Sequence, residues 1–318
     1  MFTTVAVTLA ILAGIGPEEL RPTIDRGLRF IEADGKKWKD ERDCASCHHV
    51  PMMLWTLNSA KSHGFKIDET LFFDLTEWTF REDNASKILY NADVPAEKQV
   101  YFIAPTYVAL AFPNAPPSGE KSAAKIARFA AFLQEKQSPD GSWPASGRQP
   151  VNATVESVTI LNRIALTAPW TANVQPNVEK ANAWLKAQPA SDEFQSRNLQ
   201  LVLAVLEGAP NAELLPRIDR VCEKQNPDGG WSQLPEMHSD AYATGQALYA
   251  LARARCGYDF PATARGIAFL QSSQKEDGSW SMASRKIEGA SEIKNLVPIT
   301  YAGSAWAMLG LMEAASKP

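Results

Sequence analysis

The sequence predicts an all-helical protein in which helices form two concentric rings. Two observations lead to this prediction: a turn phrase recurs at a regular interval, and amphipathic helices alternate with helices that are apolar on almost every side. The chain has 318 residues, of which 45% are hydrophobic and 21% charged. This composition excludes intrinsic disorder and is sufficient to bury the core of one large domain or two small ones.

One seven-residue phrase occurs three times. It reads QSPDGSW at 137–143, QNPDGGW at 225–231 and QKEDGSW at 274–280. The last two tryptophans are 49 residues apart and the first two are 88 apart, close to two periods of about 45 residues. We therefore expect a decayed copy in AWLKAQPASDEF, around Gln188, and another in RFIEADGKKW, which ends at Trp38.

Each phrase is typical of a turn that joins two helices. A helix ends at the glutamine, and the glycine of the P-D-G or E-D-G turn supplies a positive φ. The aspartate bonds to its own backbone, while the tryptophan folds back onto neighbouring residues.

Apolar residues at helical spacing between these turns predict twelve helices in six pairs, an outer helix followed by an inner one. The expected pairs are 18–33 with 50–63, 68–90 with 97–112, 120–137 with 152–167, 173–188 with 193–208, 211–225 with 239–256, and 261–275 with 296–315. The inner members, such as LQLVLAVLEG and TGQALYALARA, are apolar over most of their circumference and should be buried on both sides. Six such helices inside six amphipathic ones make an α/α toroid.

The Q-x-x-D-G-x-W phrase resembles the QW motif of squalene-hopene cyclases and of the wider terpenoid cyclase and protein prenyltransferase superfamily, over roughly residues 18–316. SDAYATGQALYAL at 239–251 is similar to the cyclase-like branch. The resemblance implies that the glutamines and tryptophans of the three turns are scaffold that ties outer helices together. The sequence departs from the cyclases in lacking the D-x-D-D acid motif and in having about half the length of a two-domain cyclase.

A second motif, C-x-x-C-H, lies within DCASCHHVPMMLW at Cys44, Cys47 and His48. Two thiols at this spacing can attach to the vinyl groups of a haem while the histidine binds the iron, and these five residues resemble the attachment motif of c-type cytochromes. We therefore expect one haem c. The alternatives are a zinc site completed by a carboxylate or water, a dithiol redox pair, and reduced structural cysteines.

The first sixteen residues, MFTTVAVTLAILAGIG, are too short to span a bilayer and have the length of a secretory signal, although no Lys or Arg precedes them. We expect a signal peptide at 1–16 and one toroid domain at 17–318, with the C-x-x-C-H insertion after the first outer helix. The protein would then be periplasmic or secreted, and cytoplasmic if the run is instead a buried helix. No later stretch predicts a transmembrane segment, and a net charge of −4 argues against nucleic acid as a partner.

The turn spacing places His48 and Asp240 at the starts of two inner helices, and hence at the same end of the central cavity. Unpaired N–H groups make that end weakly electropositive and suited to an anion such as a haem propionate. His238 is the best candidate for a second axial ligand, the alternative being a solvated loop histidine. His63 is a worse one, since fifteen helical residues place it about 22 Å from His48.

Asp240 and Tyr242 are the candidate catalytic residues. Asp240 is either an N-cap or a carboxylate that transfers protons inside a dry cavity. Tyr242 belongs to a group of aromatic residues on inner helices that either line the cavity, where they could hold a polycyclic ring or a carbocation, or pack in the core. The others are Trp55, Tyr301 and Trp306.

Two further features have open interpretations. Arg285 is expected to be a surface charge, with contact to a propionate or an acid as the alternative. Cys222 and Cys256 are either a disulfide or two buried thiols.

The first functional interpretation is an exported haem protein for electron transfer or haem-assisted oxidation, with a small apolar or isoprenoid-like ligand and a redox partner protein. The second is a terpenoid-cyclase-like isomerase or transferase that uses Asp240 on an isoprenoid, with zinc at the cysteine cluster as an option. A third is a scaffold whose ring encloses a hydrophobic ligand.

Overall fold

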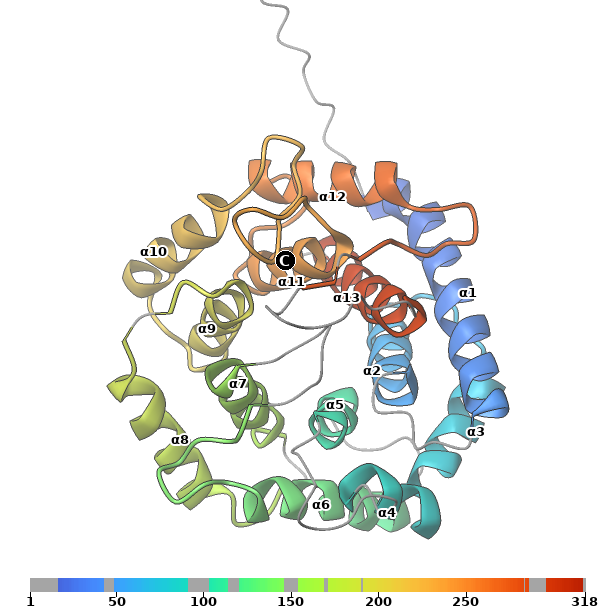
Figure 1. The fold of residues 1–318 in the computed structure, drawn as a ribbon, viewed down its shortest axis with the longest axis vertical. Coiled ribbons are helices and arrows are strands. Elements are labelled where there is room, and N and C mark those ends of the chain that lie inside the picture. The colour runs from blue at the N-terminus through green and yellow to red at the C-terminus, as the bar shows by residue number, and fades with distance from the viewer. Residues whose placement is uncertain are drawn as a thin grey trace, which may run out of the picture.

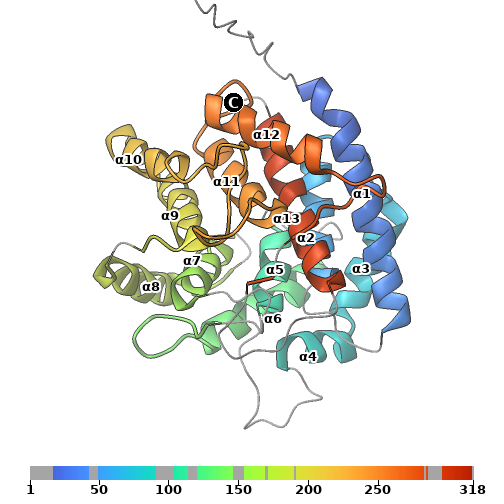
Figure 2. The ribbon, with the colours of Figure 1, turned by 45° about the horizontal axis from the view of Figure 1, so that its top comes forward.

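A computed structural model describes residues 17–42, 49–90, 103–113, 120–145, 154–168, 171–189, 191–282, 284–285 and 296–316. These ranges contain thirteen α-helices and no strand. The helices form two concentric rings (Figure 1), and an oblique view shows the inner helices running alongside one another within the outer layer (Figure 2). The predicted arrangement of two helical rings is confirmed.

Outer and inner helices alternate along the chain. The outer ring contains α1 (Pro17–Glu41), α3 (Glu69–Phe80), α4 (Glu82–Tyr90), α6 (Glu120–Glu135), α8 (Gln175–Ala187), α10 (Asn211–Cys222) and α12 (Pro261–Ser273). The inner ring contains α2 (His49–Ser62), α5 (Ala104–Ala111), α7 (Val155–Ala165), α9 (Phe194–Leu206), α11 (Ala241–Arg253) and α13 (Val297–Ala315). Most residues of the inner helices are buried, because these helices have neighbours on both faces.

The structure differs from the predicted helices in two places. The first outer helix continues to Glu41, so Trp38 is helical and the turn expected there does not form. The indole of Trp38 instead stacks on the ring of His49, with centroids 4.3 Å apart. The single helix expected at 68–90 is two helices, α3 and α4, because Arg81 between them has an extended backbone with ψ 142°.

The tryptophans of the three QW turns fix each outer helix to the inner helix that follows it. Each indole N–H donates to a carbonyl in the outer helix, and each backbone N–H to a hydroxyl of the inner helix. The indole acceptors are Leu133, Val221 and Leu270, at 2.7, 2.8 and 2.7 Å, and the hydroxyls belong to Thr159, Thr244 and Ser304, at 3.0, 2.9 and 2.9 Å. All three tryptophans are at most 1% exposed, so these bonds form away from water.

The glutamines of the same turns fix each outer helix to the next outer helix. Each side-chain amide donates to the glycine carbonyl of its own turn and to a backbone carbonyl near the start of the next outer helix. The second acceptors are Asn177, Ala262 and Thr23, at 2.9, 2.8 and 3.0 Å. The turns therefore link α6 to α8, α10 to α12, and α12 to α1. We call each such link a QW bridge, and the third closes the ring between the two ends of the chain.

The junction between α8 and α10 lacks a QW bridge. Gln188, the expected decayed copy, is at the predicted place after α8, but its amide donates to the carbonyl of Trp184 in its own helix at 3.2 Å. Charged groups hold this junction instead: Arg220 donates to the Ser191 carbonyl at 2.7 Å, and Lys224 pairs with Asp192 at 2.7 Å. The ribbon shows α8 and α10 set apart here (Figure 1), and we call this junction the seam.

We expect Gly278→Ala to destabilise the protein more than Gly208→Ala. Both glycines have positive φ, +90° and +70°, which costs another residue about 1–2 kcal/mol. Only at Gly278 would the new methyl also lie 2.2 Å from a carbonyl oxygen, that of Arg26, which would push the third QW bridge apart. Urea unfolding should therefore show a loss of about 1–2 kcal/mol for Gly208→Ala and a larger one for Gly278→Ala. Equal losses would contradict this account of ring closure.

Candidate functional site

The inner ring surrounds a cavity of about 630 Å³. Its lining comes from the second halves of all six inner helices and the residues that follow them, so it opens at the end where these helices terminate. The apolar and aromatic part of the lining is Trp55, Ala109, Leu110, Ala111, Ile164, Ala165, Ala168, Val202, Leu206 and Tyr249. The sequence predicted the functional mouth at the opposite end, where the inner helices begin.

Aromatic side chains form the floor of this cavity. The ring of Trp55 packs edge-on against Trp306, with centroids 5.2 Å apart, and lies 5.8 Å from Tyr107 and 6.2 Å from Tyr249. These four residues come from α2, α13, α5 and α11, so the floor depends on all four helices holding their places. Trp55 and Trp306 were correctly placed on inner helices, and Trp55 lines the cavity as expected.

A polar group of side chains lies behind the aromatic floor. The hydroxyl of Tyr242, which is 1% exposed, accepts a hydrogen bond from Gln195 at 3.2 Å. Burial raises the pKa of Tyr242 to about 12, so the phenol stays protonated at neutral pH. Among the described residues, the Gln246 amide and the Trp306 N–H make no hydrogen bond of normal geometry, although Gln246 faces the Tyr242 hydroxyl and the Trp306 N–H faces that of Tyr107. Buried polar atoms of this kind are rare in proteins and often meet water or a ligand.

Asp240 begins α11 as its N-cap, which confirms the structural alternative for this residue. One carboxylate oxygen accepts from the backbone N–H of Ala243 at 2.9 Å, and the other accepts from Gln233 at 2.5 Å. The side chain is 5% exposed. Its second proposed role, proton transfer, stays a prediction.

Two other predicted residues lie at this same end of the ring. His238 is exposed in the loop before α11, as expected for a solvated histidine. The expectation of a surface charge is wrong for Arg285, whose side chain is 12% exposed. Its guanidinium lies 5.2 Å from the ring centroid of Phe194 and 3.6 Å from a carboxylate oxygen of Glu193.

Cys44, Cys47 and His48 lie outside the described residues, in the segment that joins α1 to α2. The histidine next to them, His49, is fully buried at the start of α2 and lies between the rings of Trp38 and Tyr301, at 4.3 and 4.0 Å. The Tyr301 hydroxyl donates to a carbonyl of α1, that of Ile31, so this tyrosine faces the outer ring and not the cavity.

No metal site is visible in the part of the chain that the structure describes, where no three His, Cys, Asp or Glu side chains come together. Cys222 and Cys256 are free thiols, which agrees with the second of the two interpretations given for them. Burial raises the pKa of Cys222 to about 11, so this thiol is not activated as a nucleophile.

Three charged residues meet at the mouth of the cavity; the sequence singled out only His63 among them, and for a different role, as a poor candidate for an axial ligand. Glu313 of α13 lies with one oxygen 3.5 Å from Nε2 of His63 and the other 3.3 Å from Nη1 of Arg253. Nδ1 of His63 is 2.7 Å from the Ser59 carbonyl, to which it donates. No local motif could have predicted this group, because its members are far apart in the chain and meet only when the ring closes.

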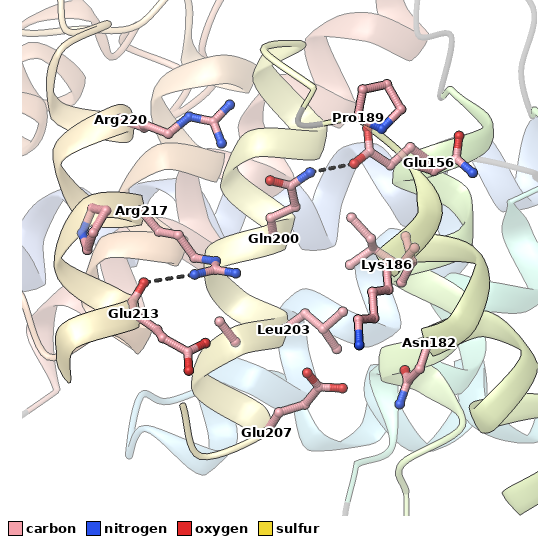
Figure 3. A pocket seen from close by; sticks show the side chains of 15 residues that line it. Glu156, Asn182, Lys186, Pro189, Gln200, Leu203, Glu207, Glu213, Arg217 and Arg220 are labelled. Carbon is pink, nitrogen blue, oxygen red and sulfur yellow. Dashed lines mark hydrogen bonds between the residues drawn. The ribbon is translucent and has the colours of Figure 1, made fainter. Parts of the chain in front are cut away.

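A second hollow, of about 750 Å³, lies at the seam (Figure 3). Its floor includes apolar residues of the inner helices, such as Ile160 and Leu203. Its charged lining is balanced, with Lys186, Arg217 and Arg220 against Glu156, Glu207 and Glu213. Figure 3 shows Gln200 donating to Glu156 and Arg217 donating to the Glu213 carbonyl across this surface. The hollow lies at the junction that lacks a QW bridge, and outside the inner ring.

Comparison with known proteins supports a terpenoid-cyclase-like toroid. Residues 188–317 match the squalene-hopene cyclase C-terminal domain. The type II terpene cyclase MstE from Scytonema, in its apo form, is 12% identical with a TM-score of 0.57, and the match covers 94% of this chain and 99% of that one. A variant of MstE solved with geranylgeranyl dihydroxybenzoate as substrate is 12% identical with a TM-score of 0.56, covering 92% and 99%.

A possible member of the GH105 family from Salmonella enterica is 14% identical with a TM-score of 0.57, and the match covers 98% of both chains. No curated protein matches the chain. At these identities the solved structures establish the fold alone, and they confirm the predicted α/α toroid. Toroids of different enzyme families share this fold, so the function has to be argued from the site. None of the described helices has the length and apolarity that crossing a bilayer would require.

We expect the His63–Glu313 pair to stabilise the fold most between pH 4.5 and 6.5, the ordinary pKa values of the two groups. Burial alone would lower the pKa of His63, but Glu313 and the Ser59 carbonyl raise it above 6.5 overall, so its contribution is lost as the pH rises through that raised value. Burial alone would raise the pKa of Glu313, but His63 and Arg253 lower it overall, so its contribution is lost as the pH falls below 4.5. The free energy of unfolding of the wild type and of His63→Gln, measured in urea from this range up to alkaline pH, should converge at alkaline pH. A constant separation would contradict the pairing.

Proposed function

We propose that the toroid binds a small apolar, isoprenoid-like molecule in its central cavity and acts on it as a cyclase-like isomerase or transferase. The observation that carries this proposal is the cavity itself, which all six inner helices line, five of them with apolar or aromatic side chains and α13 with Glu313. Its volume, about 630 Å³, is within the range of about 300–1,000 Å³ that small-molecule sites have.

The chemistry of the walls supports an isoprenoid over a sugar. Sugars are bound by many polar side chains, whereas most residues of this lining are apolar or aromatic, including Trp55 and Tyr249. The polar residues of the lining are Asn58, Ser59, Lys61, Ser62, His63, Thr167, Arg253 and Glu313. Aromatic faces attract a developing cation, and dry walls protect it from water. The matched region, 188–317, contains α9 to α13 and thus three of the six inner helices. MstE, which shares the fold, has been solved with a geranylgeranyl compound as its substrate.

For catalysis we propose roles for Asp240 and Tyr242. The Tyr242 phenol, protonated at neutral pH and bonded to Gln195, would donate a hydrogen bond or shuttle a proton from behind the aromatic floor. Asp240 lies one position before α11, at the end of the ring opposite the cavity mouth, so its carboxylate would act on the ligand only through other groups behind the floor. Because the D-x-D-D motif is absent from the sequence, direct protonation of an unactivated alkene is the least suitable reaction.

We expect Ala165→Phe to reduce ligand binding at least about tenfold, which corresponds to about 1.4 kcal/mol. The new ring would occupy the cavity that Ala165 lines. Ala204→Phe is the matched control, since Ala204 is on a neighbouring inner helix but lines the hollow at the seam. Binding of farnesol and geranylgeraniol would be measured by calorimetry and tryptophan fluorescence, and products by gas chromatography with mass spectrometry. Failure of both alcohols to bind the wild type, or equal effects of the two substitutions, would contradict the proposal.

We propose covalent haem c as a second function, which the C-x-x-C-H motif favours. Cys44 and Cys47 would hold the porphyrin and His48 its iron, in an exported protein that exchanges electrons with a redox partner. The helices on either side of the motif are fixed to each other through Trp38 and His49, which supports a firm attachment point. The motif precedes α2, whose 14 residues span about 20 Å, whereas the cavity lies at the far end of that helix. Haem and apolar ligand would therefore use opposite ends of the ring.

We expect wild-type protein made in a periplasm with haem-attachment machinery to carry one haem. Its mass should rise by one haem, and pyridine should give a haemochrome spectrum. Replacing Cys44 and Cys47 together by alanine should remove both signals, whereas Asp240→Asn should keep them. Zinc, the alternative at this cluster, would appear only in native mass or metal analysis. Colourless wild-type protein under conditions that load a control cytochrome would contradict the haem proposal.

A further inference from the structure

The mouth of the central cavity is charged, although its walls are apolar. The cavity lining includes three basic residues, Lys61, His63 and Arg253, and one acidic residue, Glu313. Lys61 is paired with Glu69 outside the cavity at 2.7 Å, so the groups that define the mouth are His63, Arg253 and Glu313. We call these three residues the mouth cluster.

The helix dipoles favour basic residues at this end of the ring. All six inner helices terminate here, and each presents the negative end of its dipole. His63 follows the last residue of α2, and Arg253 is the last residue of α11, so both lie where a helix favours a positive charge. Glu313 lies near the end of α13, where a negative charge is disfavoured unless cations offset it.

Glu313 does not use all of the hydrogen-bonding capacity of Arg253 and His63. Its contacts with Arg253 and His63, at 3.3 and 3.5 Å, are longer than the roughly 2.7–2.9 Å of a strong charged hydrogen bond. The contact with Arg253 uses one guanidinium nitrogen, whereas the group carries five N–H donors. The Arg253 side chain is 33% exposed, more than Glu313 at 15% or His63 at 18%, so it is the member of the cluster most accessible to a ligand.

We propose that the mouth cluster binds the anionic head group of the cavity's ligand, which makes that ligand an amphipathic anion: an apolar, isoprenoid-like tail with a terminal carboxylate or phosphate. Arg253 would hold two oxygens of the head group with its planar fork, and His63 would supply a second positive charge. The tail would extend along the apolar wall toward Trp55. This inference rests on the proposed function and adds to it the polar end of the substrate.

The cluster also predicts how binding depends on pH. The groups that face His63 are the Ser59 carbonyl and hydroxyl and the Ser62 hydroxyl on its own helix, Glu313 of α13 and Arg253 of α11. The His63 pKa is raised overall, so the mouth cluster has a net charge of +1 below that pKa and of zero above it. An anionic ligand should therefore bind more weakly as the pH rises through this titration, and a neutral ligand should bind equally well on both sides of it.

The test compares three probes with one tail: farnesol, farnesoic acid and farnesyl monophosphate. Calorimetry with the full-length chain should show at least one of the two anions binding about tenfold or more tightly than farnesol, the factor expected from charge-assisted hydrogen bonds worth about 1.5–3 kcal/mol. The tighter anion identifies the head group as carboxylate or phosphate. Arg253→Gln should remove this advantage, and Glu313→Gln, which deletes the competing anion, should increase it. Arg217→Gln, at the seam, is the matched control and should leave all three affinities unchanged.

Further variants separate a binding role from a structural one. Arg253→Lys keeps the charge without the fork and should retain part of the anion preference, while His63→Gln should abolish the pH dependence of anion binding. A purely structural cluster would instead make Glu313→Gln weaken every probe alike. If the three probes bind equally well and Ala165→Phe blocks all of them, the head-group proposal is overturned and the proposed function stands. Binding of none would overturn both.

Discussion

The cavity exists because Gln274 closes the ring. Its amide nitrogen bonds the Thr23 carbonyl and the carbonyl of its own turn, and its oxygen accepts from the Arg26 guanidinium at 2.6 and 3.0 Å. These bonds join α12 to α1, which are at opposite ends of the chain. They hold α13 and α2 as neighbours in the inner ring, and so place Glu313 beside His63 and Trp306 beside Trp55. A few half-buried amide contacts thus help to position both the mouth and the floor of the site.

Much of the fold could be predicted from the sequence because its turns repeat. The three phrases with Gly, Asp and Trp at fixed positions located the joints between helices, and helical spacing supplied the rest. The exceptions have physical causes. Trp38 resembles a turn tryptophan, but stacking on His49 favours its place in a helix that runs on to Glu41. The break at Arg81 carries no Gly or Pro that would have indicated it.

The site was harder to predict than the fold. Asp240 and Tyr242 were selected because they begin an inner helix, and the structure buries both at that end of the ring. The cavity opens at the other end, where the mouth cluster draws its residues from positions 63, 253 and 313. Periodicity assigns such residues to helices, but it cannot tell which helices become neighbours on closure. The C-x-x-C-H motif is the opposite situation. It is a strong local signal at Cys44 to His48, but these residues lie outside those that the structure describes.

The seam is an outer-ring junction that no QW bridge holds. Where a QW bridge is present, widening the circle would break its amide bonds, whereas at the seam it would stretch half-exposed ion pairs such as Lys224 with Asp192, which cost little to loosen in water. The inner helices on either side of the seam, α7 and α9, both contribute to the cavity wall. A larger ligand would therefore be accommodated by the ring opening at this junction, while the QW bridges keep α6 with α8 and α10 with α12 and α1.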